Sequence, residues 1–175
     1  GRGVIESPGT ARVFVAGGSN VEPQRNLAIA MREMARSWPD VQFSRAYRNI
    51  AVGFEGPDFI NWVAGFRTDW PIDQVLARLH AIEALCGRAR HAPKWAPRSM
   101  DLDVLLFDDV VATTREYQLP RPDLVKRADM LGPMAEIAPE VTHPTLGLTM
   151  GELWQRFDRD AHPLQQIDLG LTTSG

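Results

Sequence analysis

The sequence predicts an α+β fold, in which helices pack on an antiparallel sheet, and three observations support this class. The chain has 175 residues, of which 44% are hydrophobic, so it can bury a core of its own as one domain. Its apolar residues follow strand spacing in some segments and helix spacing in others. Glycine and proline separate these segments, which indicates a series of distinct strands and helices.

The first half of the predicted core contains three strands and one helix. A strand is predicted at 12–18 (RVFVAGG), where the apolar run ends in glycines. Pro23 suits the first turn of a helix, and apolar residues follow at helical spacing as far as Pro39. Residues 41–48 (VQFSRAYR) and 59–69 (FINWVAGFRTD) are predicted as strands that pair across a loop containing glycine and proline.

The second half of the predicted core contains a helix and a strand. The helix starts at Pro71, and its apolar stripe runs from Ile72 to Cys86. Glu83 lies in the middle of this stripe and His80 at its margin, so we expect Glu83 to be drawn inside and to need a partner, either the basic loop that follows or a nearby arginine. The strand DLDVLLFDD (101–109) comes next. The resulting order, β-α-β-β-α-β, predicts a ferredoxin-like core with a C-terminal extension.

The predicted domain boundaries follow the composition. Residues 1–10 are rich in glycine and proline and are predicted as a flexible tail. Residues 11–160 are predicted as the single domain, which ends with a short amphipathic helix, MGELWQRF (150–157). Residues 161–175 are predicted as a C-terminal tail.

Charge and cysteine content exclude several classes of function. The net charge of −3 argues against a protein that coats nucleic acid, so any anion site must be local. The single cysteine, Cys86, excludes an internal disulfide and a cysteine metal site. No apolar run approaches the roughly 20 residues that span a bilayer. We therefore expect a cytoplasmic protein, a monomer, without nucleic-acid or membrane partners.

Two aspartates open the strand at 101–109. In a strand, residues i and i+2 point to the same face, about 6.5–7 Å apart, so Asp101 and Asp103 aim together while Leu102 faces the other way. The repulsion between them is relieved by protonation, by a cation, or by water at an exposed strand end. Carboxylate oxygens of this kind favour Mg²⁺, which keeps several waters and is completed by substrate phosphates. The alternative is that the pair simply forms the solvated start of an edge strand.

A basic loop precedes the two aspartates. Arg88, Arg90, Lys94 and Arg98 place four of the 19 Lys and Arg residues of the chain in one short segment. Arginine offers forked donors to phosphate oxygens and lysine a point charge, so the loop can bind a polyphosphate whose metal the aspartates hold. A solvated loop is the alternative, and Trp95 can serve either as a packing anchor or as part of a lid. The sequence contains neither the P-loop motif nor the full dinucleotide fingerprint.

These segments together resemble the 6-hydroxymethyl-7,8-dihydropterin pyrophosphokinase family of folate biosynthesis. The stretches that match are VFVAGGSN, YRNIAVG, PDFINWV, GRARHAPKWAPRSMDLDVLLFDD and LPRPDLVKRADMLGPMAEIAPE, in the order of the family. The pattern R-x-R-x-x-x-[KR]-W-x-P-R-[ST]-x-D-L-D is long and specific. The resemblance implies a ferredoxin-like enzyme that transfers the β,γ-pyrophosphoryl group of ATP to the pterin hydroxymethyl oxygen and releases AMP.

The resemblance also implies a role for individual residues. Asp101 and Asp103 would bind two Mg²⁺ ions, and Arg88 and Arg98 would be the catalytic cations on the triphosphate of ATP. The other implied ATP-binding residues are Lys94, Trp95, Val104, Arg127 and Arg90. The implied pterin-binding residues are Asn61, Phe59, Val52 and Asn49.

The chain departs from the family pattern mainly in the pterin half of the site. Asp129 stands where an aromatic residue usually stacks on the pterin, and an aspartate cannot stack. Asn49 replaces a threonine, Arg121 a histidine and Ala96 a glycine. Besides the pyrophosphokinase, the sequence therefore leaves open a catalytically reduced paralogue that binds nucleotide or a different pterin, and an RNA-binding module that uses the basic loop.

Overall fold

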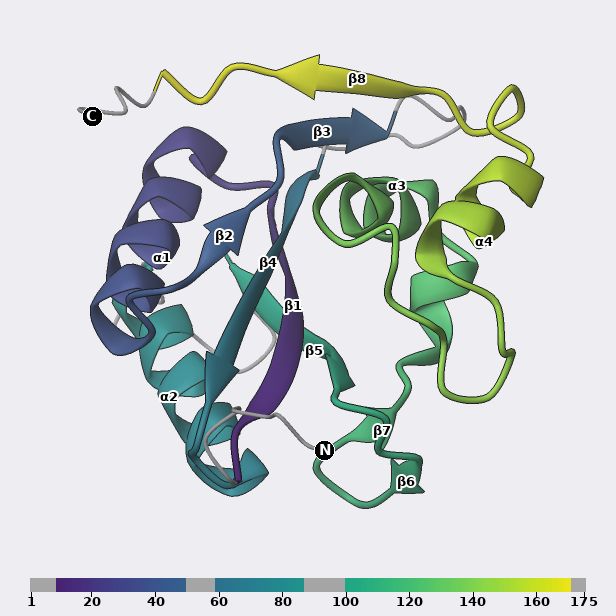
Figure 1. The fold of residues 1–175 in the computed structure, drawn as a ribbon. Coiled ribbons are helices and arrows are strands. Elements are labelled where there is room, and N and C mark those ends of the chain that lie inside the picture. The colour runs from purple at the N-terminus through teal and green to yellow at the C-terminus, as the bar shows by residue number, and fades with distance from the viewer. Residues whose placement is uncertain (1–8, 50–58, 87–99, 171–175) are drawn as a thin grey trace.

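The computed structural model describes residues 9–49, 59–86 and 100–170, and its elements follow the predicted order (Figure 1). The elements of the predicted core are β1 (Ala11–Ser19), α1 (Pro23–Ser37), β2 (Gln42–Phe43), β3 (Ala46–Asn49), β4 (Ile60–Thr68), α2 (Ile72–Leu85) and β5 (Asp101–Phe107). The C-terminal extension contains β6 (Ala112–Thr113), β7 (Gln118–Leu119), the 3-10 helix η1 (Pro122–Val125), α3 (Ala128–Ile137), α4 (Met150–Arg156) and β8 (Leu164–Ile167). The mixed fold with an antiparallel sheet is therefore confirmed.

The main sheet has the strand order β5-β1-β4-β3-β8, and β2 also pairs with β4. Every pairing in it is antiparallel. The predicted strand 41–48 forms as two short strands, because the Ser44 hydroxyl accepts the backbone N–H of Val63 at 2.9 Å and so interrupts the backbone ladder. The sheet also gains β8, which pairs with β3 inside the range for which the sequence predicts a tail.

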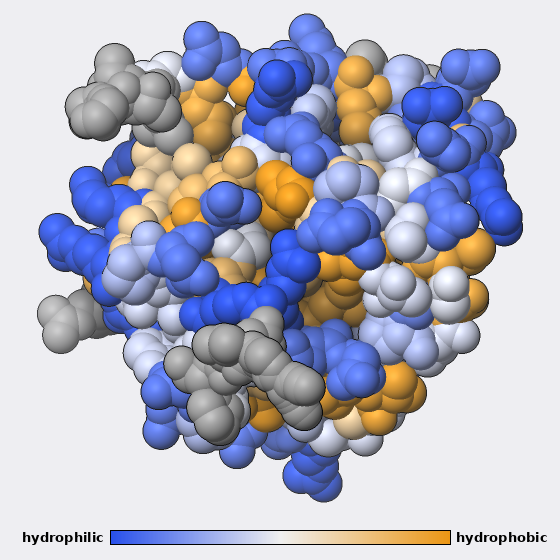
Figure 2. Space-filling model, viewed as in Figure 1, coloured by the Kyte–Doolittle hydropathy of each residue, from blue (hydrophilic) through white to orange (hydrophobic). Residues whose placement is uncertain are grey.

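Helices cover both faces of this sheet (Figure 1). One hydrophobic cluster joins α1 and α2 to residues such as Val15, Trp62 and Val104, and we call this side the α1/α2 face. A second cluster joins α3 and α4 to Ala16 and Val63, and we call that side the α3 face. Because strand residues alternate between faces, the long strands β1, β4 and β5 each contribute to both clusters. Hydrophilic side chains cover most of the surface seen in Figure 2, with hydrophobic residues exposed between them.

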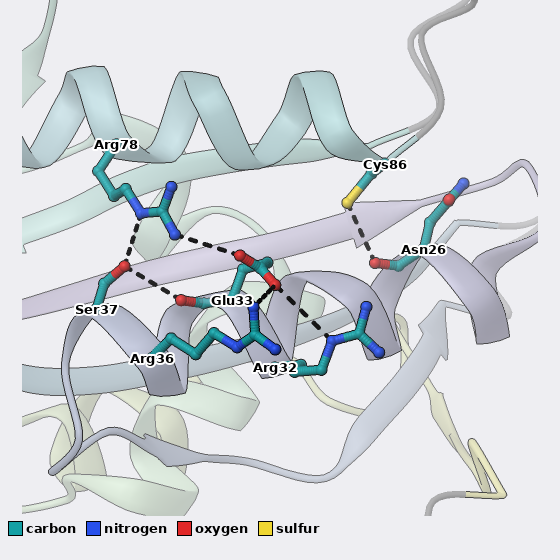
Figure 3. A network of polar contacts seen from close by, with 7 residues as sticks. All are labelled: Asn26, Arg32, Glu33, Arg36, Ser37, Arg78 and Cys86. Carbon is teal, nitrogen blue, oxygen red and sulfur yellow. Dashed lines mark hydrogen bonds and ion pairs between the residues drawn. The ribbon is translucent and has the colours of Figure 1, made fainter.

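A polar network ties α1 to α2 (Figure 3). Arg78 of α2 donates to the hydroxyl of Ser37 at 2.7 Å and to the Glu33 carboxylate at 3.3 Å, both on α1. Glu33 is only 9% exposed, so this guanidinium supplies the partner that a largely buried carboxylate needs. At the other end of α2, the Cys86 thiol donates to the backbone oxygen of Asn26, and burial raises the pKa of the thiol to about 11. The network holds α1 against α2 on the α1/α2 face of the sheet.

Two adjacent glycines in β1 leave space on opposite faces of the sheet. A Cβ atom on Gly17 would lie 2.6 Å from the Trp62 ring, which packs on the α1/α2 face. A Cβ atom on Gly18 would lie 2.1 Å from Oδ1 of Asn61 on the α3 face. Both distances are shorter than real Cβ contacts, so neither neighbour could keep its position against a larger residue. In the described part of the chain, no helix is both long and apolar enough to span a membrane.

Candidate active site

The aspartates of β5 point to the α3 face. β5 pairs with β1 so that Asp101 lies opposite Gly18 and Asp103 opposite Ala16. Residues that lie opposite one another in an antiparallel pair share a face, and Ala16 belongs to the cluster on the α3 face. The expectation that both carboxylates aim to one side, away from Leu102, is therefore confirmed.

Asn61 lies in the same row of the sheet. Gly18 pairs with Asp101 on one side and with Asn61 of β4 on the other. Since neighbouring strands are about 4.8 Å apart, the backbones of Asn61 and Asp101 are separated by about 10 Å, with only a glycine between them. The Phe59 ring also reaches this glycine, 3.6 Å from the position of a Cβ atom there. The row forms a floor with an amide and an aromatic ring at one end and the carboxylate of Asp101 at the other.

Arg121 faces Asp103 from the segment after β7. Its backbone N–H donates to the oxygen of Leu105 at 3.0 Å, which attaches this segment to β5. Its Nη2 lies 3.6 Å from Oδ2 of Asp103, and its Nε lies 3.7 Å from the Asp123 carboxylate. Burial raises the pKa of Asp103, the Arg121 cation lowers it, and the neighbouring Asp101 raises it further, with a net upward shift. Asp103 therefore sits where negative charge is costly and a cation is favoured.

Glu83 supports the strand that bears the aspartates. Its carboxylate accepts the backbone N–H of Leu102 at 2.7 Å, an N–H at the edge of the sheet. Burial raises the pKa of Glu83, although the hydrogen bond from Leu102 and the charge of His80 lower it. The expected need for a partner is met by this backbone group. The basic loop at 87–99 lies outside the described residues, so a contact between Glu83 and that loop stays a prediction.

Arg127 and Asp129 meet at the start of α3. Nε of Arg127 donates to Oδ1 of Asp129 at 3.0 Å, and Nη2 donates to Oδ2 at 2.8 Å. Oδ2 also accepts Nδ2 of Asn61 at 2.5 Å. Asp129 is 1% exposed and lies in the first turn of α3, where the helix dipole favours a negative charge. The residue that departs most from the family pattern is thus fully paired and links Asn61 to Arg127.

The other predicted residues are divided between several places. Phe59 is 38% exposed beside the floor, and Asn49 ends β3, where it pairs with Leu164 of β8. Val104 is 5% exposed and packs on the α1/α2 face, so its side chain is not brought together with the carboxylates. The predicted residues that lie outside the described part of the chain are Val52, Arg88, Arg90, Lys94, Trp95 and Arg98.

Asp101 and Asp103 supply only two carboxylate groups as possible metal ligands. Within residues 9–49, 59–86 and 100–170, no group of three or more His, Cys, Asp or Glu side chains could hold a metal ion. Two carboxylates on one face suit Mg²⁺, because this ion keeps waters and takes phosphate oxygens as further ligands. The arrangement can therefore hold a metal-bound polyphosphate beside a planar polar ligand.

Sequence reasoning missed two relationships in this site. The ion pair of Arg121 with Asp103 joins residues 18 positions apart, and the bond of Asn61 to Asp129 joins residues 68 positions apart. No local spacing signals either contact. The R-x-D spacing of Arg127 and Asp129 was visible, but its pairing depends on where α3 begins.

The profile of one protein family matches most of the chain. It is described as 7,8-dihydro-6-hydroxymethylpterin-pyrophosphokinase (HPPK) and matches residues 14–139. Two relatives carry the name 2-amino-4-hydroxy-6-hydroxymethyldihydropteridine pyrophosphokinase. The protein of Aquifex aeolicus is 32% identical over 77% of this chain and 84% of its own. That of Pseudomonas aeruginosa is 35% identical over 76% of this chain and 84% of its own.

Solved structures show the same fold. A Plasmodium falciparum HPPK-DHPS chain, crystallised with STZ-DHP, matches with a TM-score of 0.64 at 13% identity, over 84% of this chain. Another, crystallised with SDX-DHP, matches with a TM-score of 0.62 at 12% identity, over 83% of this chain. The chain spans less than half the length of these solved chains, 41% and 43%.

Proposed function

Because the chain belongs to the 7,8-dihydro-6-hydroxymethylpterin-pyrophosphokinase family, we propose that it transfers pyrophosphate from ATP to the hydroxymethyl oxygen of 6-hydroxymethyl-7,8-dihydropterin and releases AMP. One observation supports this most directly. The amide of Asn61 and the carboxylate of Asp101 lie in one row on the α3 face, separated by Gly18. A pterin at one end of this row and a polyphosphate at the other would bring the two reacting groups together.

Asp101 and Asp103 would hold Mg²⁺, and we propose two ions, as the resemblance implies. The site fits such a cation because burial and the charge of Asp101 raise the pKa of Asp103, whose described ion-pair partner is a partly exposed arginine at 3.6 Å. Bound Mg²⁺ would neutralise the charge of the phosphate oxygens and orient them. The argument for Mg²⁺ binding rests on these two carboxylates and on their position on the same face of the sheet, the α3 face.

The remaining residues would bind and align the substrates. Asn61 would hydrogen-bond the pterin, and Phe59 would contact its ring. Arg127 would face the phosphates, together with Arg88 and Arg98 of the basic loop, which stay predictions. The pterin hydroxyl would then attack the β-phosphorus and lose its proton to water, the bond from this phosphorus to the oxygen of AMP would break, and AMP would leave. Such a transfer depends on alignment and charge stabilisation, with no covalent enzyme intermediate required.

A direct assay tests the proposal. The purified protein is incubated with ATP, Mg²⁺ and 6-hydroxymethyl-7,8-dihydropterin, and the nucleotide products are separated by chromatography. We expect AMP and pyrophosphorylated pterin in equal amounts. The appearance of ADP would reject pyrophosphoryl transfer.

A second candidate function is a paralogue that binds the ligands with reduced turnover. It is favoured by Asp129, since both carboxylate oxygens are engaged where the family usually has an aromatic ring. Calorimetry with the pterin, combined with the product assay above, separates the two candidates. Binding of pterin and nucleotide without AMP formation would support the paralogue, and rapid AMP formation would exclude it.

A further inference from the structure

We infer that a pocket between α3, α4 and the edge strands β3 and β8 is a second binding site of this protein, which takes a planar aromatic ligand with a carboxylate group. The pocket has a volume of about 660 Å³, a size typical of small-molecule sites. Figure 1 shows the four elements that surround it. None of its lining residues belongs to the candidate active site, so the inference goes beyond the proposed function.

Two parts of the chain build the pocket. Residues of β3 and α3 form one wall, and α4 with the segment that follows it as far as β8 forms the other. The second wall lies beyond residue 139, where the match to the family profile ends. The proposed pyrophosphoryl transfer therefore gives this wall no role.

The indole ring of Trp154 gives the pocket an aromatic surface. Gly132 of α3 lets this ring come close, since a Cβ atom on the glycine would lie 3.0 Å from Cη2 of Trp154. Phe157 stacks on the ring, with the two centroids 5.6 Å apart. Trp154 is partly exposed, and the described part of the chain offers no acceptor to its indole N–H. The ring is thus held in place, and it can contact a planar ligand and donate a hydrogen bond to it.

Arg159 places a positive charge beside this ring. Its Cζ lies 5.8 Å from the centroid of the Trp154 ring. The neighbouring Asp158 carboxylate accepts the backbone N–H of Ala161 at 3.3 Å, and no carboxylate among the described residues forms an ion pair with Arg159. The forked N–H groups of Arg159 are therefore available to the carboxylate oxygens of a ligand.

Glu136 supplies the only carboxylate among the described residues that line the pocket, and it is already engaged. One of its oxygens accepts the hydroxyl of Tyr47, and the other accepts the backbone N–H of Arg45 at 2.8 Å. Burial, together with the bond to Glu136, raises the pKa of Tyr47 to about 12, so the phenol stays protonated and keeps donating. The charge of Arg45 acts on the same phenol, which places a second guanidinium at this wall.

The charges of the lining favour an anion with a single negative charge. Arg45 and Arg159 outnumber Glu136, so one positive charge is left for a ligand to balance. A carboxylate group balances it, whereas a phosphate dianion would bring an excess negative charge close to Glu136. The flat surface of Trp154 and the fork of Arg159 together match an aromatic ring that carries a carboxylate.

The binding of 2-naphthoate, a planar aromatic carboxylate, tests the site. The probe is titrated into the full chain, and the indole N–H resonances of its five tryptophans are followed by proton–nitrogen correlation NMR. Trp154→Phe identifies the resonance of Trp154. We expect 2-naphthoate to shift this resonance with a Kd of about 0.1–1 mM. The uncharged 2-naphthamide has nearly the same shape and should bind about tenfold more weakly, because it cannot pair with the charge of Arg159.

Two arginine variants locate the site. Arg159→Gln should weaken the binding of 2-naphthoate by about tenfold, to the level of 2-naphthamide. Arg156→Gln is the matched control, because Arg156 is an exposed arginine in the last turn of α4 that does not line the pocket. We expect this control to bind the probe as the wild type does. Both variants should form AMP at the wild-type rate, since neither arginine belongs to the candidate active site.

The outcomes separate the inference from the proposed function. A wild-type protein that forms AMP but shows no shift of the Trp154 resonance at millimolar 2-naphthoate overturns the inference and leaves the function intact. Equal affinity for 2-naphthoate and 2-naphthamide, or in the wild type and Arg159→Gln, also overturns it, as does tighter binding of 2-naphthyl phosphate. Complete displacement of the probe by 6-hydroxymethyl-7,8-dihydropterin would place it in the active site and overturn the inference. Binding of the probe at Trp154 by a protein that forms no AMP would overturn the function alone.

Discussion

The carboxylate of Glu83 in α2 lies 2.7 Å from the backbone nitrogen of Leu102, the residue between the two aspartates of β5. A helix on one face of the sheet thereby holds the backbone whose side chains act on the other face. The same bond brings a third carboxylate near Asp101 and Asp103, whose charges raise the pKa of Glu83.

We predict that Glu83→Gln stabilises the metal-free protein at neutral pH. Glutamine keeps an oxygen for Leu102 and removes the buried charge. Because the pKa of Glu83 is raised above 4.5 in the folded state, its protonation stabilises the fold below pH 4.5, and this contribution is lost as the pH rises through the folded pKa. The melting temperature of Glu83→Gln at pH 7 should therefore exceed that of the wild type by about 2 °C, with the difference vanishing toward pH 4.

Glu83→Ile is the control for the hydrogen bond. It removes the charge and the acceptor together, so it should melt below Glu83→Gln at every pH. A lower melting temperature for Glu83→Gln than for the wild type at pH 7 would mean that the ionised carboxylate of Glu83 stabilises the folded protein, and would contradict the prediction.

Asp103→Asn should abolish Mg²⁺-dependent turnover and leave the fold intact. We expect AMP formation to fall by about 100-fold or more, because an amide is a poor ligand for Mg²⁺. The melting temperature should not fall, since burial already disfavours the charge of Asp103. Product assays and thermal melts on Asp103→Asn and on Asp109→Asn, a variant in the turn after β5, provide the comparison. Full activity of Asp103→Asn would show that this carboxylate binds no essential metal.

Arg121→Ala should strengthen the binding of Mn²⁺, used as a probe for Mg²⁺, in the absence of nucleotide. The guanidinium lies 3.6 Å from Asp103 and competes with a metal ion for the same negative charge. Its removal should tighten Mn²⁺ binding by about fivefold, measured by electron paramagnetic resonance at low salt. Arg115→Ala removes an exposed arginine and should change nothing. Weaker Mn²⁺ binding by Arg121→Ala would contradict this competition.

Gly18→Ala should weaken pterin binding selectively. The added methyl group would lie 2.1 Å from the Asn61 oxygen, so the amide would have to move. We expect the affinity for the pterin to fall by about tenfold. The equivalent change in α4, Gly151→Ala, places a methyl group 3.3 Å from Cβ and from the backbone oxygen of Pro139, away from Asn61, and should leave the affinity unchanged. Wild-type affinity in Gly18→Ala would mean that Asn61 does not contact the pterin.

The sequence predicted the core elements well because their signals are local. The alternation in β1 and β5, the helical stripe of α2 and the prolines at helix starts each occupy one short window. The i, i+2 rule alone placed Asp101 and Asp103 on one face, and the pairing with β1 confirms it. The register that puts Asn61 in the same row could not be read, because it depends on how three strands align.

The C-terminal extension was harder to predict for physical reasons. α3 contains Gly132 and Pro133, which argue against a helix, but its buried residues pack on the sheet and outweigh this local preference. β8 has the sequence LQQI, too short and too polar to signal a strand, and it forms because the edge of β3 offers hydrogen-bonding groups. In both elements, tertiary contacts decide what the local sequence leaves open.

The glycine pair of β1 places two unrelated demands on neighbouring positions. A side chain at Gly17 would collide with Trp62 in the core, and one at Gly18 would collide with Asn61 over the floor of the site. A change at one position therefore cannot relieve the constraint at the other, since Gly17 serves the packing of the core and Gly18 serves the placement of Asn61, the residue proposed to bind the pterin.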